Sequence, residues 1–157
     1  MIAWRIAKRP YSSPEAVLSG EGAWRLGGRW NARGLPLVYA ATNSSLALLE
    51  TLVNVSAHNL AESLVIVPID VPDDAPSGSI DASRLPELWQ ERDRSACSKI
   101  GSKWIVDKSE LVLRVPSATN PLDQNILINP LHEQISRCTV GAPLPVRFDP
   151  RLLQLVP

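Results

Sequence analysis

The chain has 157 residues, of which 45% are hydrophobic, so it is long enough to bury the core of one domain spanning residues 1–157. Sixteen basic and sixteen acidic residues cancel, which argues against a protein drawn by net charge to nucleic acid or to an anionic membrane. No apolar stretch is long enough for a signal-peptide core or a membrane span, so we expect a soluble protein of the cytoplasm.

The first third of the chain predicts two strands and one helix. Residues 2–7 have the composition of a short strand that carries Arg5, and residues 10–21 have the proline and serine content of a loop. Residues 37–41 read as a second strand, and the polar residues 42–45 offer helix N-caps. Apolar side chains then recur at helical spacing over 46–55, with Glu50 at the edge of the apolar stripe.

The remaining two thirds predict more strands than helices. We expect strands over 64–67, 111–115, 126–128 and 146–148, an acidic loop over 70–78, and a solvent-facing helix over 86–95. Regular alternation of strands and helices, which a doubly wound parallel sheet needs, is missing. The predicted fold class is therefore α+β, with a mixed β-sheet core and flanking helices.

The two cysteines, Cys97 and Cys138, are far apart and lack the spacing of a zinc site or a disulfide framework. We expect buried thiols and no metal. The sequence also contains no P-loop, no GxGxxG after a strand, no HExxH and no GxSxG, which removes support for common kinase, dehydrogenase and hydrolase sites.

The most informative stretch is Gly27-Gly28-Arg29-Trp30-Asn31. Two glycines allow a sharp turn, and the planar guanidinium of Arg29 suits phosphate or carboxylate, with Trp30 beside it able to stack. The same turn is also compatible with plain loop structure in which Arg29 pairs with a nearby carboxylate.

Other polar residues add to this candidate site. Arg5 lies on the first strand, Tyr39 on the second, Glu50 on the helix and Ser117 at the end of a strand. Each has an ordinary structural alternative, such as a boundary glutamate for Glu50 and a turn residue for Ser117. Together they offer cations for a pyrophosphate, an aromatic face for a flat cationic ring, and a carboxylate for a developing positive charge. A site that cleaves the nicotinamide–ribose bond of NAD needs these groups.

With these residues and several others in order, the sequence resembles the RES-domain family, the toxins that pair with Xre-type antitoxins. The resemblance rests on Trp4-Arg5-Ile6, Gly27-Gly28-Arg29-Trp30-Asn31, Tyr39, Ala47-Leu48-Leu49-Glu50, Gly101, Trp104, Val115-Pro116-Ser117, Asn125 and Leu127-Ile128-Asn129-Pro130-x-His132. It continues to Phe148-Asp149-Pro150-Arg151-Leu152. One departure is Glu133, where many relatives are expected to have proline.

The resemblance implies an ADP-ribosyltransferase-like fold and toxicity through NAD degradation by hydrolysis or phosphorolysis. It implies Arg29, Tyr39 and Glu50 as catalytic residues, and Arg5, Trp30, Ser117 and Asn125 as substrate-binding residues. Asn129 and His132 are expected to support the site, and His132 either braces it or takes part in proton transfer. NAD is the expected substrate.

The same resemblance implies a DNA-binding antitoxin of Xre type that covers the active site, and it leaves homodimerisation open. Direct binding of this chain to nucleic acid or membrane is not expected. Two alternatives remain at this point. The same site could transfer ADP-ribose to a protein, as a mono-ADP-ribosyltransferase does, or the basic N-terminal third could make the chain a non-enzymatic interaction module.

Overall fold

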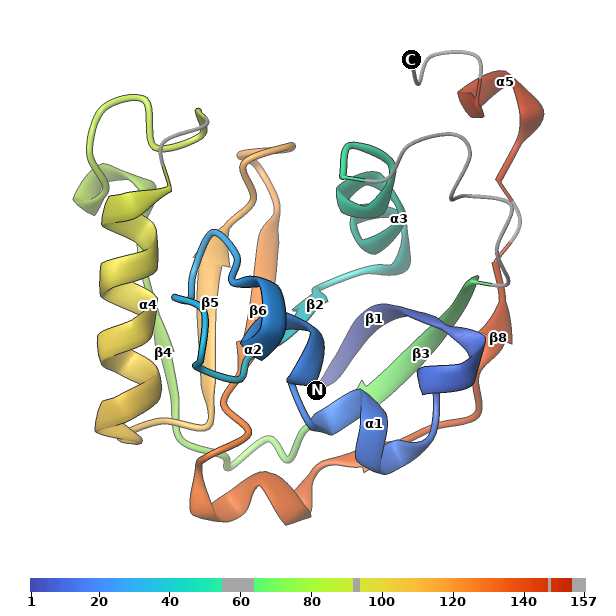
Figure 1. The fold of residues 1–157 in the computed structure, drawn as a ribbon, viewed down its shortest axis with the longest axis horizontal. Coiled ribbons are helices and arrows are strands. Elements are labelled where there is room, and N and C mark those ends of the chain that lie inside the picture. Colours follow the sequence, from blue (N-terminus) through green and yellow to red (C-terminus); the bar gives the residue numbers. More distant parts are fainter. Residues whose placement is uncertain (55–63, 92–93, 147, 154–157) are drawn as a thin grey trace.

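The computed structural model describes residues 1–54, 64–91, 94–146 and 148–153. Its centre is an eight-stranded sheet in the order β4-β5-β6-β2-β1-β3-β7, with β8 also paired to β3. The pairing is antiparallel except between β4 and β5. The predicted α+β class with a mixed sheet is confirmed (Figure 1).

Strands form where the sequence has short β-branched or apolar runs. Their bounds are β1 Ile2–Lys8, β2 Val38–Ala41, β3 Leu64–Asp70, β4 Ser77–Ser79, β5 Val112–Pro116, β6 Gln124–Ile128, β7 Thr139–Val140 and β8 Leu144–Pro145. The expected strands near residues 2–7, 37–41, 64–67, 111–115 and 126–128 are confirmed. The last strand was predicted too late, because β8 ends at Pro145; Arg147 lies outside the described residues.

The helices are α1 Pro14–Leu18, α2 Glu21–Leu26, α3 Ser44–Leu52, α4 Ser95–Asp107 and α5 Pro150–Leu153, with short 3-10 turns at Arg9–Tyr11, Ala82–Arg84 and Glu133–Arg137. Helix α3 confirms the prediction from the apolar stripe, and Asn43 caps it by accepting a hydrogen bond from the Leu46 N–H at 2.8 Å. Residue 55, the expected end of this helix, lies outside the described residues.

Two expectations about the helices are wrong. Residues 10–21 contain α1, whose N-cap Ser13 accepts from the Ala16 N–H, so they are not a continuous loop. The helix expected over 86–95 is not formed by residues 86–91: Leu88 has a φ of 65°, which no right-handed helix accommodates, and the chain turns there. Residues 92–93 lie outside the described residues, and Ser95 begins the next helix, α4. Trp89 is only 6% exposed and packs against Trp30, so packing of that ring holds the turn.

The next helix, α4, was not predicted, although its buried side has helical spacing. Cys97, Gly101, Trp104 and Ile105 are buried in a row along it. At Gly101 the helix touches the chain at Trp30, where an added Cβ would lie 2.0 Å from the Trp30 carbonyl oxygen. Gly101 therefore allows α4 to approach residues 27–31, the glycine–arginine turn, closely.

The two faces of the sheet carry different clusters. In β2, Val38 and Ala40 face a large apolar cluster, while Tyr39 and Ala41 face the opposite side, as strand alternation requires. That opposite side carries two smaller clusters. One, the α4 cluster, includes Trp30, Trp89 and the buried side of α4. The other, the α3 cluster, includes Ala41 of β2 and Leu46 and Ala47 of α3. Figure 1 shows α4 and α3 standing apart over the sheet.

Within the described ranges, no helix has both the length and the apolar character needed to cross a membrane. Both cysteines are buried and free, as expected.

Candidate active site

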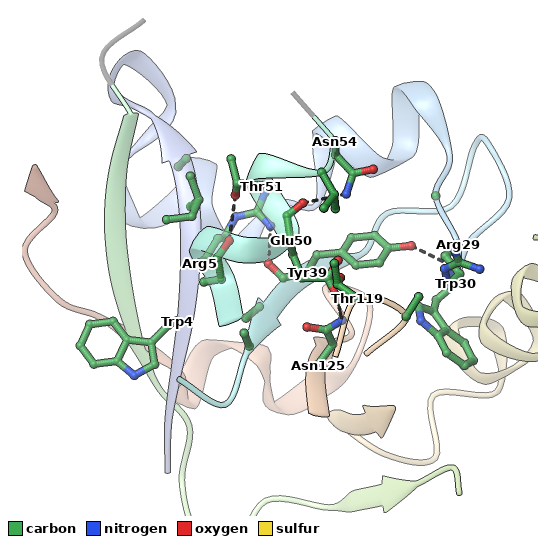
Figure 2. Close-up of a pocket in the computed structure, with 18 of the residues that line it drawn as sticks. Trp4, Arg5, Arg29, Trp30, Tyr39, Glu50, Thr51, Asn54, Thr119 and Asn125 are labelled. Atoms are coloured by element: carbon green, nitrogen blue, oxygen red, sulfur yellow. Dashed lines mark hydrogen bonds between the residues drawn. The ribbon is translucent and has the colours of Figure 1, made fainter. Parts of the chain in front are cut away.

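A pocket of about 710 Å³ lies between the α3 and α4 clusters. Its lining comes from β1, β2, α3, the glycine–arginine turn (residues 27–31), the start of β6, and Gln90, Glu91 and Arg94. Figure 2 shows Arg5, Glu50 and Asn125 converging on the middle of this pocket, with Tyr39 running from there toward Trp30 and Arg29. Residues far apart in the sequence are therefore brought together here.

Glu50 lies on α3 and is half-buried. Its Oε1 accepts a hydrogen bond from the Ser117 hydroxyl and another from the Asn125 side-chain amide, both at 2.7 Å. Among the described residues, Oε2 of Glu50 has no hydrogen-bond partner and no cation within 4.0 Å. One carboxylate oxygen is therefore fixed by the protein while the other is available to a ligand.

Ser117 follows β5, where its N–H donates to the Asp123 carbonyl at 3.0 Å and closes the hairpin to β6. Its Oγ accepts hydrogen bonds from the Thr119 and Asn120 N–H groups at 3.1 and 3.0 Å. Because both lone pairs are used, the hydroxyl hydrogen is directed to Glu50. Ser117 is fully buried, so water does not compete for this bond.

Arg5 enters the pocket beside a break in the sheet. In the described part of the chain, β1 and β2 pair at one position, Trp4 with Ala41. Two residues before Ala41 in β2, the Tyr39 carbonyl accepts from Nη1 of Arg5 at 2.9 Å. The Arg5 side chain thus supplies the Tyr39 carbonyl with the hydrogen-bond donor that a neighbouring strand would otherwise provide.

The guanidinium of Arg5 has no carboxylate within 4.0 Å among the described residues, and its buried Nε has no hydrogen-bond partner. Burial lowers the pKa of Arg5 to about 10, which still leaves it charged at neutral pH. A partly buried cation with no carboxylate beside it among the described residues is an arrangement that an anion in the pocket would stabilise.

Tyr39 connects the sheet to the glycine–arginine turn. Its hydroxyl accepts from the Trp30 N–H at 2.9 Å and donates to Oδ1 of Asn31 at 2.8 Å. Asn31 in turn donates to the carbonyls of Ala23, Ala32 and Leu35, and is buried. Burial raises the pKa of Tyr39 well above its usual value, so the phenol stays protonated and acts as a fixed wall of the pocket.

Arg29 lines the pocket, but most of its donors are already used. Nη1 donates to the carbonyls of Trp89 and Glu91, and Nη2 donates to that of Gln90 at 3.0 Å. The guanidinium also lies 5.9 Å from the centre of the Trp89 ring. No carboxylate neutralises it within the described residues, so its positive charge acts on the pocket while its hydrogen bonds hold residues 89–91.

The stacking role expected for Trp30 conflicts with its burial. The residue is 2% exposed, and its ring lies 6.4 Å from that of Trp89 in the α4 cluster. Trp30 is among the residues that line the pocket, but a ring enclosed to this extent serves mainly as a packing residue.

Asn129 and His132 are not brought to this pocket. Asn125 lies near the start of β6, whereas Asn129 and His132 follow its end. The four residues from Asn125 to Asn129 span about 13 Å in an extended strand. Asn129 donates to the Ile105 carbonyl at 3.0 Å and accepts from the Leu131 N–H, and Nδ1 of His132 accepts from the Gln134 N–H. Both residues stabilise the turn after β6, and the structure offers no support for proton transfer by His132.

Several pocket residues were missed by sequence reasoning, notably Arg94, Thr119, Thr51 and Asn54. Arg94 lies in a charged stretch that was interpreted as a solvated helix face, and the other three are ordinary polar residues near the ends of elements. One signal could have placed Arg94 at the start of a helix: it precedes Cys97 and Gly101, whose spacing is that of one helix face. Among the described residues, no three His, Cys, Asp or Glu side chains gather into a possible metal site.

The chain is similar to known proteins along most of its length. Residues 2–149 match the family model of the RES domain. The chain is 38% identical over 132 residues to "Toxin Res" of Photorhabdus laumondii, covering 83% of each protein. It is 34% identical over 154 residues to "Toxin Res" of Yersinia enterocolitica, covering 97% of this chain and 99% of the relative.

Another relative is the "Prs ADP-ribosylating toxin" of Sphingobium sp., 35% identical over 154 residues and covering 96% of both proteins. Among solved structures, a chain from the crystal structure of the M. tuberculosis MbcT-MbcA toxin-antitoxin complex has a TM-score of 0.75. It is 22% identical, and the match covers 99% of this chain and 87% of that chain, which shows a shared fold. The family match and the similarity along nearly the whole length lead to one conclusion: the protein described here belongs to the RES-domain family.

Proposed function

We propose that this protein is the toxin of a toxin–antitoxin pair and that it degrades NAD by cleaving the nicotinamide–ribose bond. The observation that carries the proposal is the Glu50 carboxylate, held at Oε1 by Ser117 and Asn125 with Oε2 open to the pocket. The names of its relatives, three of which contain the word toxin, support the biological role.

In the proposed reaction the bond between the nicotinamide nitrogen and the ribose carbon breaks, and its electron pair neutralises the pyridinium ring. Positive charge then develops on the ribose. Glu50 stabilises this charge, directly or through a ribose hydroxyl, and does so more strongly in the transition state than in the ground state. Because its position is already fixed by two hydrogen bonds, little reorganisation is needed.

The remaining pocket residues bind and orient the substrate in this proposal. Arg5 and Arg29 provide positive charge for the pyrophosphate, and the Tyr39 ring lines the nicotinamide side. Ser117 and Asn125 act by positioning Glu50. Trp30 contributes by packing beneath the turn that carries Arg29.

An oxygen nucleophile completes the reaction by attacking the ribose carbon and releasing a proton to solvent. Water gives ADP-ribose and phosphate gives its phosphorylated form. The second candidate is transfer to a protein, which the ADP-ribosylating relative from Sphingobium favours.

The proposed partner is an Xre-type DNA-binding antitoxin that covers the pocket. The described fold is shared with a chain from a toxin–antitoxin complex, which supports a partner of this kind. A protein that destroys NAD in its own cell needs such inhibition.

Purified protein incubated with NAD labelled in the adenosine part tests the proposal. We expect free nicotinamide together with labelled ADP-ribose, or its phosphate when phosphate is present, identified by mass spectrometry. Label retained on one protein, in a reaction supplemented with cell extract, would support transfer instead. A folded protein that leaves NAD intact and binds only another protein would favour the non-enzymatic module.

Glu50→Gln is the decisive variant, with Glu91→Gln as its control because Glu91 also lines the pocket. Losing one preorganised charge typically lowers the rate by about a hundredfold to a thousandfold. We expect this loss for Glu50→Gln and near-normal turnover for Glu91→Gln. Normal turnover by a folded Glu50→Gln protein would remove Glu50 from the proposed role.

A further inference from the structure

Arg94 is one of the residues that line the pocket containing Glu50. It is exposed and forms the N-cap of α4, but its side chain makes no capping hydrogen bond. Among the described residues, its guanidinium has no hydrogen-bond acceptor and no carboxylate within 4.0 Å. No described residue therefore uses any of the five N–H donors of this group, and a ligand can bond to them.

Arg29, on the same side of the pocket, is in the opposite situation. Three main-chain carbonyls, those of Trp89, Gln90 and Glu91, accept from its two terminal nitrogens. An anion that displaced them would leave carbonyl groups without donors. On the side of the pocket that Arg29 lines, direct hydrogen bonds to a phosphate must therefore come largely from another residue.

Arg94 is close enough to affect the other groups on this side of the pocket. Burial lowers the pKa of Arg29, and the positive charge of Arg94 lowers it further. The same charge opposes the rise in the pKa of Tyr39 that burial causes. Two guanidinium groups thus line one pocket, and no carboxylate of the described residues bonds to either, an arrangement that a bound anion would stabilise.

We propose that Arg94 is a substrate-binding residue whose guanidinium bonds directly to the pyrophosphate of the dinucleotide, while Arg29 holds residues 89–91 in place and adds charge. This inference rests on the proposed function for the identity of the ligand. It assigns the phosphate contact to Arg94, which was expected from the sequence to lie on a solvent-facing helix.

Binding of ADP-ribose, measured by calorimetry at low salt, tests the inference without requiring turnover. ADP-ribose contains the pyrophosphate but no nicotinamide bond. The variants are Arg94→Gln, which removes the charge, Arg94→Lys, which keeps the charge but loses the planar donor set, and Arg84→Gln as control. Arg84 is also an exposed arginine, in the 3-10 turn Ala82–Arg84, and does not line the pocket.

We expect Arg94→Gln to raise the Kd for ADP-ribose about tenfold, as loss of a charge-assisted hydrogen bond does. Arg94→Lys should fall between Arg94→Gln and the parent protein, and Arg84→Gln should match the parent. In NAD turnover, Arg94→Gln should raise KM and leave kcat nearly unchanged, because the contact is equal in ground and transition states.

An unchanged Kd in folded Arg94→Gln protein overturns the inference, and so does a parent protein that does not bind ADP-ribose. A parent protein that binds ADP-ribose with the expected dependence on Arg94 but releases no nicotinamide from NAD would overturn the proposed function and leave the inference standing.

Discussion

The hydroxyl of Ser117 donates a hydrogen bond of 2.7 Å to Oε1 of Glu50, although the two residues are 67 positions apart. The bond joins the end of β5 to helix α3 across the pocket. Since two main-chain N–H groups fix the orientation of the hydroxyl, the position of the carboxylate is set by the β5–β6 hairpin as much as by its own helix.

Ser117→Ala should lower kcat for NAD degradation by about tenfold to a hundredfold, the range expected when a charged group loses one hydrogen bond. It should also lower the free energy of unfolding by about 1–3 kcal/mol, because the Thr119 and Asn120 N–H groups lose their acceptor. Steady-state kinetics and urea unfolding measure the two effects. Ser109→Ala, at an exposed serine, is the control; parent-like kcat in Ser117→Ala would contradict positioning of Glu50 by this hydroxyl.

Arg29→Lys should destabilise the protein although it keeps the positive charge. A lysine ammonium cannot reproduce the planar arrangement that reaches three successive carbonyls, so we expect a loss of about 1–2 kcal/mol in the free energy of unfolding. Arg33→Lys, in the same turn but exposed, should have little effect. Equal stability of the two variants in urea unfolding would show that the carbonyl contacts contribute little.

Tyr39 should make the fold sensitive to alkali. Its pKa is raised in the folded state above the ordinary value of 10.0, so above that pH the unfolded chain loses a proton that the folded chain keeps. The contribution of the protonated Tyr39 hydroxyl to the free energy of unfolding is therefore fully present below pH 10.0, and it is lost as the pH rises above that value. In a Tyr11→Phe variant, which leaves Tyr39 as the remaining tyrosine, phenolate absorbance should appear together with unfolding. Phenolate formation in a protein that is still folded would contradict the burial of this hydroxyl.

Gly101→Ala should be strongly destabilising, because the new methyl group would overlap the Trp30 carbonyl, with a separation of 2.0 Å. Overpacking of this kind costs about 1–3 kcal/mol or more, and displacement of α4 from the turn should also weaken ADP-ribose binding. Gly22→Ala is the matched control, since nothing lies within 4 Å of an added Cβ there. In α2 the alanine should be neutral or stabilising by about 0.5–1 kcal/mol. Similar melting temperatures for both variants would show that α4 can move away without loss.

Helices and strands with strong local signals were predictable. The apolar stripe and the Asn43 cap specify α3 locally, and β-branched runs specify β3 and β6. The turn at 86–91 was not predictable. Leu88 adopts a left-handed conformation there, and the adjacent Trp89 packs against Trp30, which is distant in the sequence. Local propensity carries no information about that contact.

The sequence by itself determined the family resemblance, the α+β class and the residue types available for binding an anion and stabilising positive charge. These follow from spacing and side-chain chemistry along the chain. Only the tertiary structure decided which of those residues share a pocket: Arg5, Tyr39, Glu50 and Asn125 line it, and the buried Ser117 bonds to Glu50, whereas Asn129 and His132 support a distant turn. It also decided that Arg29 uses its donors on carbonyls, while no described residue accepts from Arg94. The physical reason is that hydrogen-bond partners are set by strand register and helix packing, which join residues separated by tens of positions in the chain.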